Sequence, residues 1–175
     1  MKKILLASLI AALPAIAIAA DSSGPYIGAE AGYAKLQSSD GGVAVGRFFG
    51  GYTVNENVGV ELGLFRTADV DYIYPTTTVS VHAYGVDASV LLRPSISTGL
   101  NGLFVRVGAH YDDVNASATN GRWADKWGGG FMLGAGYDAK ITDNLSARIS
   151  YSYLDNVAGS DYSANVGNLG LQYKF

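Results

Sequence analysis

The chain contains no cysteine, only four prolines, and no long hydrophobic run after its first twenty residues. Without cysteine, no disulfide framework can hold an exported domain together. Without a further run of about 20 apolar residues, the rest of the chain offers no candidate membrane helix. The net charge of −3, from 12 basic and 15 acidic residues, leaves no basic footprint for nucleic acid. We therefore expect no nucleic-acid partner, and another kind of scaffold must hold the chain together.

The N-terminus has the layout of a secretory signal peptide. A short cationic start precedes an apolar run over residues 4–18, which ends in the small residues Ala19 and Ala20. This run is too short for a membrane anchor. We expect residues 1–20 to be removed, with cleavage after Ala19 or Ala20, and residues 21–175 to form one domain.

The last eight residues alternate strictly between apolar and polar side chains, as a β-strand does when one face meets an apolar phase. The apolar members are Leu169, Leu171, Tyr173 and Phe175. A transmembrane barrel closes with such a strand, whose aromatic residues face lipid at the interface. The pattern resembles the C-terminal strand of bacterial outer-membrane proteins. This resemblance implies that the four residues form the signal read by the outer-membrane insertion machinery.

The same two-residue alternation extends over most of the remaining chain and predicts eight strands. Abundant glycine (23 residues) and tyrosine (12), with 49% hydrophobic residues, argue against disorder and against a helical bundle. The predicted strands lie near residues 25–36, 43–54, 58–68, 79–92, 101–113, 127–141, 145–155 and 164–175. Each is about long enough to cross a bilayer at a tilt. The sequence thus predicts an all-β fold, an eight-stranded antiparallel up-and-down transmembrane β-barrel.

The predicted connections alternate between two classes, as expected for short periplasmic turns and longer extracellular loops. The short or modest ones, rich in turn-forming residues, are 55–57, 93–100 and 142–144. The others, mostly longer and more polar, are 37–42, 69–78, 114–126 and 156–163. We expect both chain ends to lie on the periplasmic side, which requires an even number of strands.

The two faces of the predicted strands differ in polarity. One face is continuously apolar and carries no charge within the expected membrane band, where a charge would cost about 2–4 kcal/mol. The opposite face is small and polar, which is the reverse of a soluble ligand-binding barrel with its apolar interior. Its charged members form a predicted ion-pair network in the lumen: Glu30, Arg47, Glu61, Asp87, Arg106 and Arg148. Because an eight-stranded interior is just filled by side chains, we expect these groups to plug it.

A further resemblance is carried by residues 134–156, where a glycine-rich strand, a Thr-Asp-Asn turn and a strand with an inward Arg148 follow one another. This stretch is similar to the penultimate hairpin of the OmpA-like outer-membrane β-barrel superfamily. The resemblance covers nearly all of the mature chain and implies a small eight-stranded barrel in the bacterial outer membrane. We expect it to lack the peptidoglycan-binding domain that many relatives carry.

Few residues suggest catalysis. Ser80 and His82 share the outward face of one strand, and some eight-stranded barrels are lipid A-modifying enzymes with a lipid-facing Ser and His. Such chemistry needs a carboxylate to orient the histidine, and Asp69 or Asp71 is near enough in sequence. The local sequence does not match the deacylase motif. We expect an interfacial polar pair here and no catalytic residues.

Metal or cofactor binding is not expected either. His110 is predicted to point inward with Asp112 on the same face, but two histidines without cysteine at no ligand spacing make a poor metal site. The run of glycines at 128–130 precedes a strand rather than a helix, so it cannot cradle a phosphate. We predict no metal and no cofactor.

The leading functional hypothesis is a non-enzymatic integral outer-membrane protein, a structural barrel whose surface loops serve adhesion or binding. The first alternative is a narrow gated pore, and the second is a lipid A-modifying enzyme. Expected partners are outer-membrane lipid and lipopolysaccharide, periplasmic chaperones, the insertion machinery, and a host or surface ligand at the loops. We expect a monomer.

Overall fold

The computed structural model describes residues 23–37, 41–75, 77–94, 102–118 and 121–175, without the side chains of residues 122–125. The expected signal peptide lies outside the described residues. The strands are β1 (Gly24–Leu36), β2 (Val43–Thr53), β3 (Val58–Thr67), β4 (Val70–Tyr74), β5 (Thr77–Leu92), β6 (Leu103–Ala118), β7 (Gly121–Lys140), β8 (Leu145–Leu154) and β9 (Ala164–Lys174). A 3-10 turn, η2 (Val157–Gly159), stands between β8 and β9. In the described part of the chain, no helix is long and apolar enough to cross a membrane.

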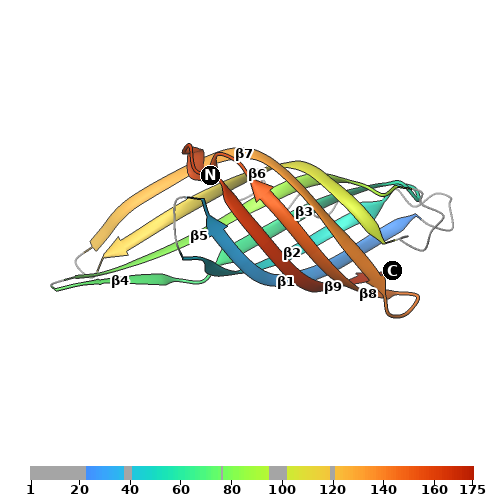
Figure 1. Cartoon of the computed structure of the whole chain (residues 1–175), viewed down its shortest axis with the longest axis horizontal. Coiled ribbons are helices and arrows are strands. Elements are labelled where there is room, and N and C mark those ends of the chain that lie inside the picture. The colour runs from blue at the N-terminus through green and yellow to red at the C-terminus, as the bar shows by residue number, and fades with distance from the viewer. Residues whose placement is uncertain (1–22, 38–40, 76, 95–101, 119–120) are drawn as a thin grey trace, which may run out of the picture.

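The strands form one closed antiparallel barrel (Figure 1). Apart from β3 and β4, strands that are neighbours in sequence pair with each other, β1 pairs with β9, and the pairing of β3 with β5 completes the circle. β4 pairs only with β5 and continues the path of β3 beyond a break at residues 68 and 69. The predicted eight-stranded up-and-down barrel is confirmed, because β3 and β4 together occupy the position of one of its eight strands. The closed part of the sheet has no unpaired edge, whereas β4, which pairs only with β5, leaves one edge without a strand partner among the described residues.

Two predicted loops are wrong. The segments 69–78 and 114–126 are largely strand in the structure, because β4 and the far ends of β5, β6 and β7 project past the barrel as a ribbon. Figure 1 shows β4 lying along the far end of β5, away from both labelled chain ends. Their many polar residues suggested loops, yet cross-strand pairing continues through them from Tyr74↔Thr77 to Val79↔Ala118. We call this projecting sheet the ribbon.

The polarity of the two sheet faces inverts where the barrel becomes the ribbon. The outward residues of β5 change from Val90, Ala88, Val86 and Tyr84 to His82, Ser80 and Thr78. The inward residues of β5 change from Ser89, Asp87 and Gly85 to Ala83, Val81 and Val79. β6 inverts at the same level, since Tyr84 pairs with Asp113 and Ala83 with Val114. The barrel is thus built for an apolar surrounding, and the ribbon has the polarity of a sheet in water.

The opposite end of the barrel is closed by short turns. The Asn55 side chain accepts hydrogen bonds from the amides of Asn57 and Val58, both at 2.9 Å. The last strand is secured here as well, because the Lys174 amide donates to the carbonyl of Asn144 at 2.8 Å and Phe175 N donates to the carbonyl of Pro25 at 3.2 Å. The C-terminal residues therefore complete the barrel seam against β1 and β8.

Candidate functional site

The centre of the lumen holds the charged residues that the alternation placed on the inward face. Arg47 on β2 reaches acids on three other strands. Its Nη1 lies 2.9 Å from Glu30 Oε2, and its Nη2 lies 2.9 Å from Glu61 Oε1. It also forms a bidentate pair with Asp87, through Nε at 2.8 Å and Nη2 at 2.6 Å. One guanidinium thus ties β1, β3 and β5 to β2.

Glu61 is the acid that binds the largest number of arginines in this group. Its Oε1 accepts from Arg47 and from Arg106 Nη2 at 2.8 Å, while its Oε2 accepts from Arg148 Nη1 at 2.7 Å. The Tyr26 hydroxyl also donates to Oε2 at 3.2 Å. Removing a carboxylate from water is costly, and this many donors offset that cost. The structure therefore brings all six sequence-predicted charges into one connected cluster, which we call the ionic layer.

Two charged residues of the ionic layer were missed by sequence reasoning. Asp138 forms a bidentate pair with Arg148, with Nε at 2.6 Å and Nη2 at 3.0 Å, and Arg93 Nη2 lies 3.3 Å from Asp138 Oδ2. Asp138 follows Gly134 and Gly136 on the inward face of β7, so strict alternation would have found it. Arg93 follows β5 and was assigned to a turn. The layer therefore contains four arginines and four acids.

Uncharged residues also take part in the ionic layer and were not predicted to do so. Ser150 donates to Glu30 Oε1 at 2.8 Å, and Arg148 Nη2 donates to Gln172 Oε1 at 2.5 Å. Both residues occupy polar positions of the two-residue alternation. They pair with further oxygens and protons of the cluster, in which, among the described residues, the buried atoms left without a partner are Arg93 Nη1 and Arg106 Nε.

An apolar layer closes the lumen toward the short turns. Tyr26, Phe49, Leu91 and Phe104 point inward from four strands and are all buried. The Phe49 and Phe104 rings lie beneath the guanidinium of Arg148, with its Cζ 4.6 and 4.8 Å from their centroids. Cation–π contacts are strongest where water is excluded. The ionic layer thus rests on a packed aromatic floor.

A third cluster ties the loop between β8 and β9 to the barrel wall. His110 Nδ1 lies 2.8 Å from Asp112 Oδ1, and its Nε2 lies 2.7 Å from the carbonyl oxygen of Asp155. The second oxygen of Asp112 accepts from the Ala158 amide at 2.9 Å. This contact holds η2, where Ala158 has a left-handed φ of 52°. The pair predicted to share an inward face thus acts as a loop clamp.

Ser80 and His82 do not assemble a catalytic triad. Ser80 Oγ donates to Asp71 Oδ1 at 2.5 Å, while His82 Nδ1 pairs with Asp69 Oδ1 at 3.1 Å. Ser80 is thus paired with Asp71 of β4 and His82 with Asp69, just before β4. Among the described residues, no hydrogen bond joins Ser80 to His82. A triad requires that bond to activate the nucleophile. The arrangement consists of two polar side-chain pairs, Ser80 with Asp71 and His82 with Asp69, on the ribbon.

The described residues contain no group of three or more side chains suited to hold a metal ion. The glycines at 128–130 lie inside β7, with Gly128 packed against η2. These positions serve close backbone packing, because a Cβ on Gly128 would collide with the backbone of Gly159.

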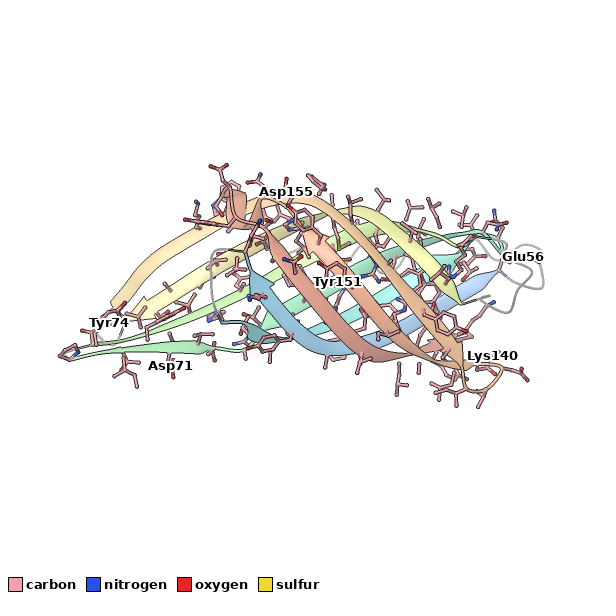
Figure 2. The ribbon with its side chains drawn as sticks, viewed as in Figure 1. Glu56, Asp71, Tyr74, Lys140, Tyr151 and Asp155 are labelled. Carbon is pink, nitrogen blue, oxygen red and sulfur yellow. The ribbon has the colours of Figure 1, made fainter. Side chains whose placement is uncertain are left out.

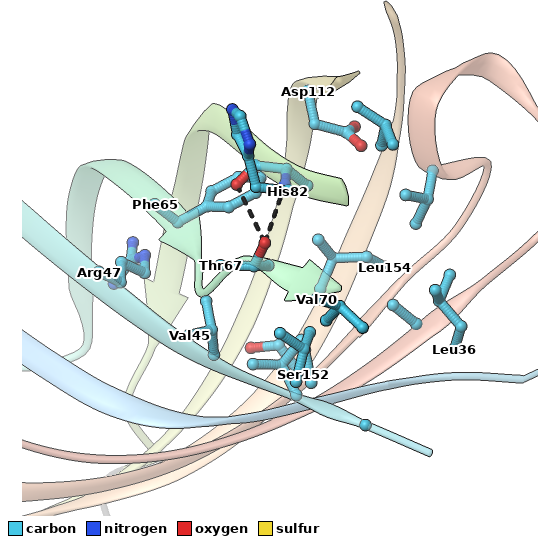
Figure 3. A pocket seen from close by; sticks show the side chains of 18 of the residues that line it. Leu36, Val45, Arg47, Phe65, Thr67, Val70, His82, Asp112, Ser152 and Leu154 are labelled. Carbon is cyan, nitrogen blue, oxygen red and sulfur yellow. Dashed lines mark hydrogen bonds between the residues drawn. The ribbon is translucent and has the colours of Figure 1, made fainter. Parts of the chain in front are cut away.

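A cavity of about 260 Å³ lies above the ionic layer, on the side of the ribbon (Figure 3). Arg47, Asp87 and Arg106 of the ionic layer line its inner end. Its walls are mainly apolar and include Val45, Phe65, Val81, Val114, Met132 and Val166. The Thr67 hydroxyl at its side is already bonded to the backbone of Ala83, as the dashed lines in Figure 3 mark. We call this space the mouth cavity.

The ribbon carries exposed apolar residues at its tip. Tyr72 and Tyr74 are half exposed and Ile73 is 83% exposed. Figure 2 places Tyr74 at the extreme end of the molecule, far from Glu56 and Lys140 at the other end. Tyr84 is one of the outward aromatic residues of the barrel. Thr77, at the start of β5, lies about 23 Å from it along the strand. The tip therefore stands well clear of the apolar band.

Closed pairing, an outward apolar band with aromatic residues, and a charged, filled interior define a transmembrane β-barrel of the bacterial outer membrane. The outer membrane protein beta-barrel domain family model matches residues 4–175, and the chain belongs to this family. No curated protein matches the chain. Outer-membrane barrels have short periplasmic turns and longer extracellular segments, so we expect the short turns to face the periplasm and the ribbon to face the cell exterior.

Solved structures show the same fold at low sequence identity. Ail, the attachment invasion locus protein of Yersinia pestis, in complex with the heparin analogue sucrose octasulfate, is 20% identical, with a TM-score of 0.61 over 87% of this chain and 97% of that one. Neisserial surface protein A is 22% identical, with a TM-score of 0.59 over 89% and 100%. A major outer membrane protein from Thermus thermophilus is 14% identical, with a TM-score of 0.64 over 88% and 100%.

Proposed function

We propose that this protein is a surface-binding outer-membrane protein that uses the ribbon to attach to a partner protein. The observation that carries the proposal is the exposed apolar tip at Tyr72, Ile73 and Tyr74 on a rigid, paired sheet. A soluble surface rarely presents such a patch without a partner. Rigid presentation also lowers the ordering cost of binding.

The charges beside the tip favour one class of partner. Asp69 and Asp71 lie on the ribbon, and Asp113 lies at its base, where it accepts from Tyr84 at 3.0 Å. Tyrosine and isoleucine flanked by carboxylates suit a protein surface with an apolar pocket and basic rim. Ail was solved with a sulfated heparin analogue. Of these carboxylates, Asp69 faces a cation, Arg66 at 3.8 Å, and the negative charge that Asp71 and Asp113 add disfavours a polyanion of that kind.

The filled lumen supports binding over conduction as the function. In the part of the chain that the structure describes, the apolar floor and the ionic layer cross the barrel, and the buried arginines Arg47 and Arg148 are each held by two or more partners. We propose that the barrel does not conduct ions steadily and acts as a scaffold for the ribbon. We also propose that it is not an enzyme, since Ser80 and His82 are each occupied by a separate carboxylate.

The test is adhesion of bacteria that express the protein to surfaces coated with a basic protein or with heparin. We expect adhesion to the basic protein, whose cations complement the carboxylates beside the tip, and at least a tenfold reduction for the double variant Ile73→Ser, Tyr74→Ser. Tyr162→Ser is the matched control, because Tyr162 is an equally exposed aromatic on another outer loop. Adhesion to neither surface, or equal adhesion of all three proteins at equal surface amounts, would contradict the proposal.

A further inference from the structure

We propose that the mouth cavity is a binding site for a small, uncharged aliphatic molecule that enters from the cell exterior. The first observation is the inverted polarity above the ionic layer. Inward positions that are polar in the barrel centre become Ala83, Val81 and Val114 at the mouth. A polar lumen open to water needs no such change. An apolar wall in contact with the exterior is instead the property of a ligand pocket.

The size of the cavity sets the size of its ligand. A dry cavity of about 150 Å³ holds one benzene, so 260 Å³ holds about ten non-hydrogen atoms at the same density. Val45, Phe65 and Met132 supply apolar contacts around this volume. An aliphatic chain of about eight to ten carbons, or one end of a longer chain, would fill the space.

The charges at the inner end of the cavity determine that the ligand is neutral. Arg47, Asp87 and Arg106 line this end. Arg47 and Asp87 form a bidentate pair, and Arg106 Nη2 is bound by Glu61 at 2.8 Å, while Arg106 Nε is buried without a hydrogen-bond partner. Asp112 is likewise occupied by His110 and by the Ala158 amide. The ionic layer contains four arginines, namely Arg47, Arg93, Arg106 and Arg148, and four acids, namely Glu30, Glu61, Asp87 and Asp138. Because these charges balance, a carboxylate or ammonium entering the cavity would add an uncompensated charge, whereas the oxygen of a neutral hydroxyl can accept from the unpaired Nε of Arg106.

The mouth cavity is closed at its inner end. Below the ionic layer, Tyr26, Phe49, Leu91 and Phe104 fill the lumen and are 5% exposed or less. A molecule that enters from outside is thus retained at the outer mouth and does not cross to the periplasm by this route. The test of this inference is separable from the adhesion test, because Ile73 and Tyr74, the residues replaced there, do not line the cavity, although Tyr72 does.

The test uses Met132, which lines the cavity, is 3% exposed, and is the only methionine of the chain besides Met1. The barrel, labelled with ¹³C-methyl methionine, is placed in discs of deuterated phospholipid and titrated with 1-octanol or with ionised octanoate. We expect a saturable shift of the Met132 methyl signal and transferred contacts to octanol protons. Octanoate should need at least a tenfold higher concentration for the same shift.

Ala83→Phe should fill the cavity and abolish the saturable response. Ala88→Phe is its matched control on the same strand, because Ala88 is exposed on the outward face and should keep the response. Val166→Phe serves as a second filling variant if Ala83→Phe does not fold. A linear shift without saturation, a response unchanged by filling, or equal responses to octanol and octanoate would overturn the proposal.

Discussion

Arg47 and Asp87 face each other across the lumen as a bidentate pair, with Nε to Oδ2 at 2.8 Å and Nη2 to Oδ1 at 2.6 Å. They belong to β2 and β5, which are separated by β3 in the barrel wall. The pair therefore spans the interior where the wall provides no direct hydrogen bond. It makes the ionic layer a structural element of the barrel as well as a barrier.

Arg47→Ala should destabilise the barrel, because Glu30, Glu61 and Asp87 would lose one shared cation. Removal of one partner from a fully buried pair costs about 3–5 kcal/mol, and less where lumen water reaches the remaining group. Urea-induced unfolding in lipid vesicles measures the change. The double variant Arg47→Gln, Asp87→Asn should recover part of the loss, and Arg47→Gln, Glu30→Gln should recover less, since Glu30 makes only one of the contacts. Equal stability of these variants and the wild type would show that the residues do not interact.

Asp112→Asn should loosen the loop between β8 and β9. The substitution weakens the acceptor for the Ala158 amide and the charged partner of His110. Hydrogen exchange at Ala158 should accelerate at least tenfold, while exchange in β1 and β9 should not change. Asp113→Asn is the neighbouring control, because Asp113 contacts Tyr84 and Asn115 and not this loop. Unchanged protection of Ala158 in the Asp112 variant would refute the clamp.

Replacing both Tyr173 and Phe175 with Ser should sharply lower outer-membrane insertion and leave protein in the periplasm. The physical reason is that these aromatics end the strand that closes the seam with β1, where Tyr173 pairs with Ile27. Cell fractionation and the gel shift between unheated and boiled samples measure insertion. Lys174→Ser, at the position between the two aromatics, is the control and should insert normally. Insertion of the double variant at wild-type yield would disprove the role of the terminal strand.

Much of the barrel could be predicted from sequence because the membrane imposes one simple rule. Leu169, Leu171 and Tyr173 show it in the final strand, and the same rule placed Arg47 and Glu61 in the lumen. Side chains that alternate between lipid and interior give a period of two that needs no knowledge of tertiary contacts.

The rule fails where the membrane ends. In the ribbon, polar side chains face outward and Val79 and Val81 face inward, so residues 69–78 had the composition of a loop while pairing as strands. The contact of Asp112 with Ala158 joins residues 46 apart and depends on a left-handed turn, which no local pattern specifies. Asp138 was missed because it lies near a turn, although its position obeys the alternation.

The central claim is that the lumen is closed by the ionic layer and its aromatic floor, so that the barrel serves as a scaffold and not as a pore. The most direct test is single-channel recording of the purified barrel in planar bilayers, for the wild type and for Glu61→Gln. Wild-type protein should show no sustained conductance. Glu61→Gln should raise transient openings, because Arg106 and Arg148 lose the charge of their shared acceptor. Steady wild-type conductance that Glu61→Gln leaves unchanged would contradict the account.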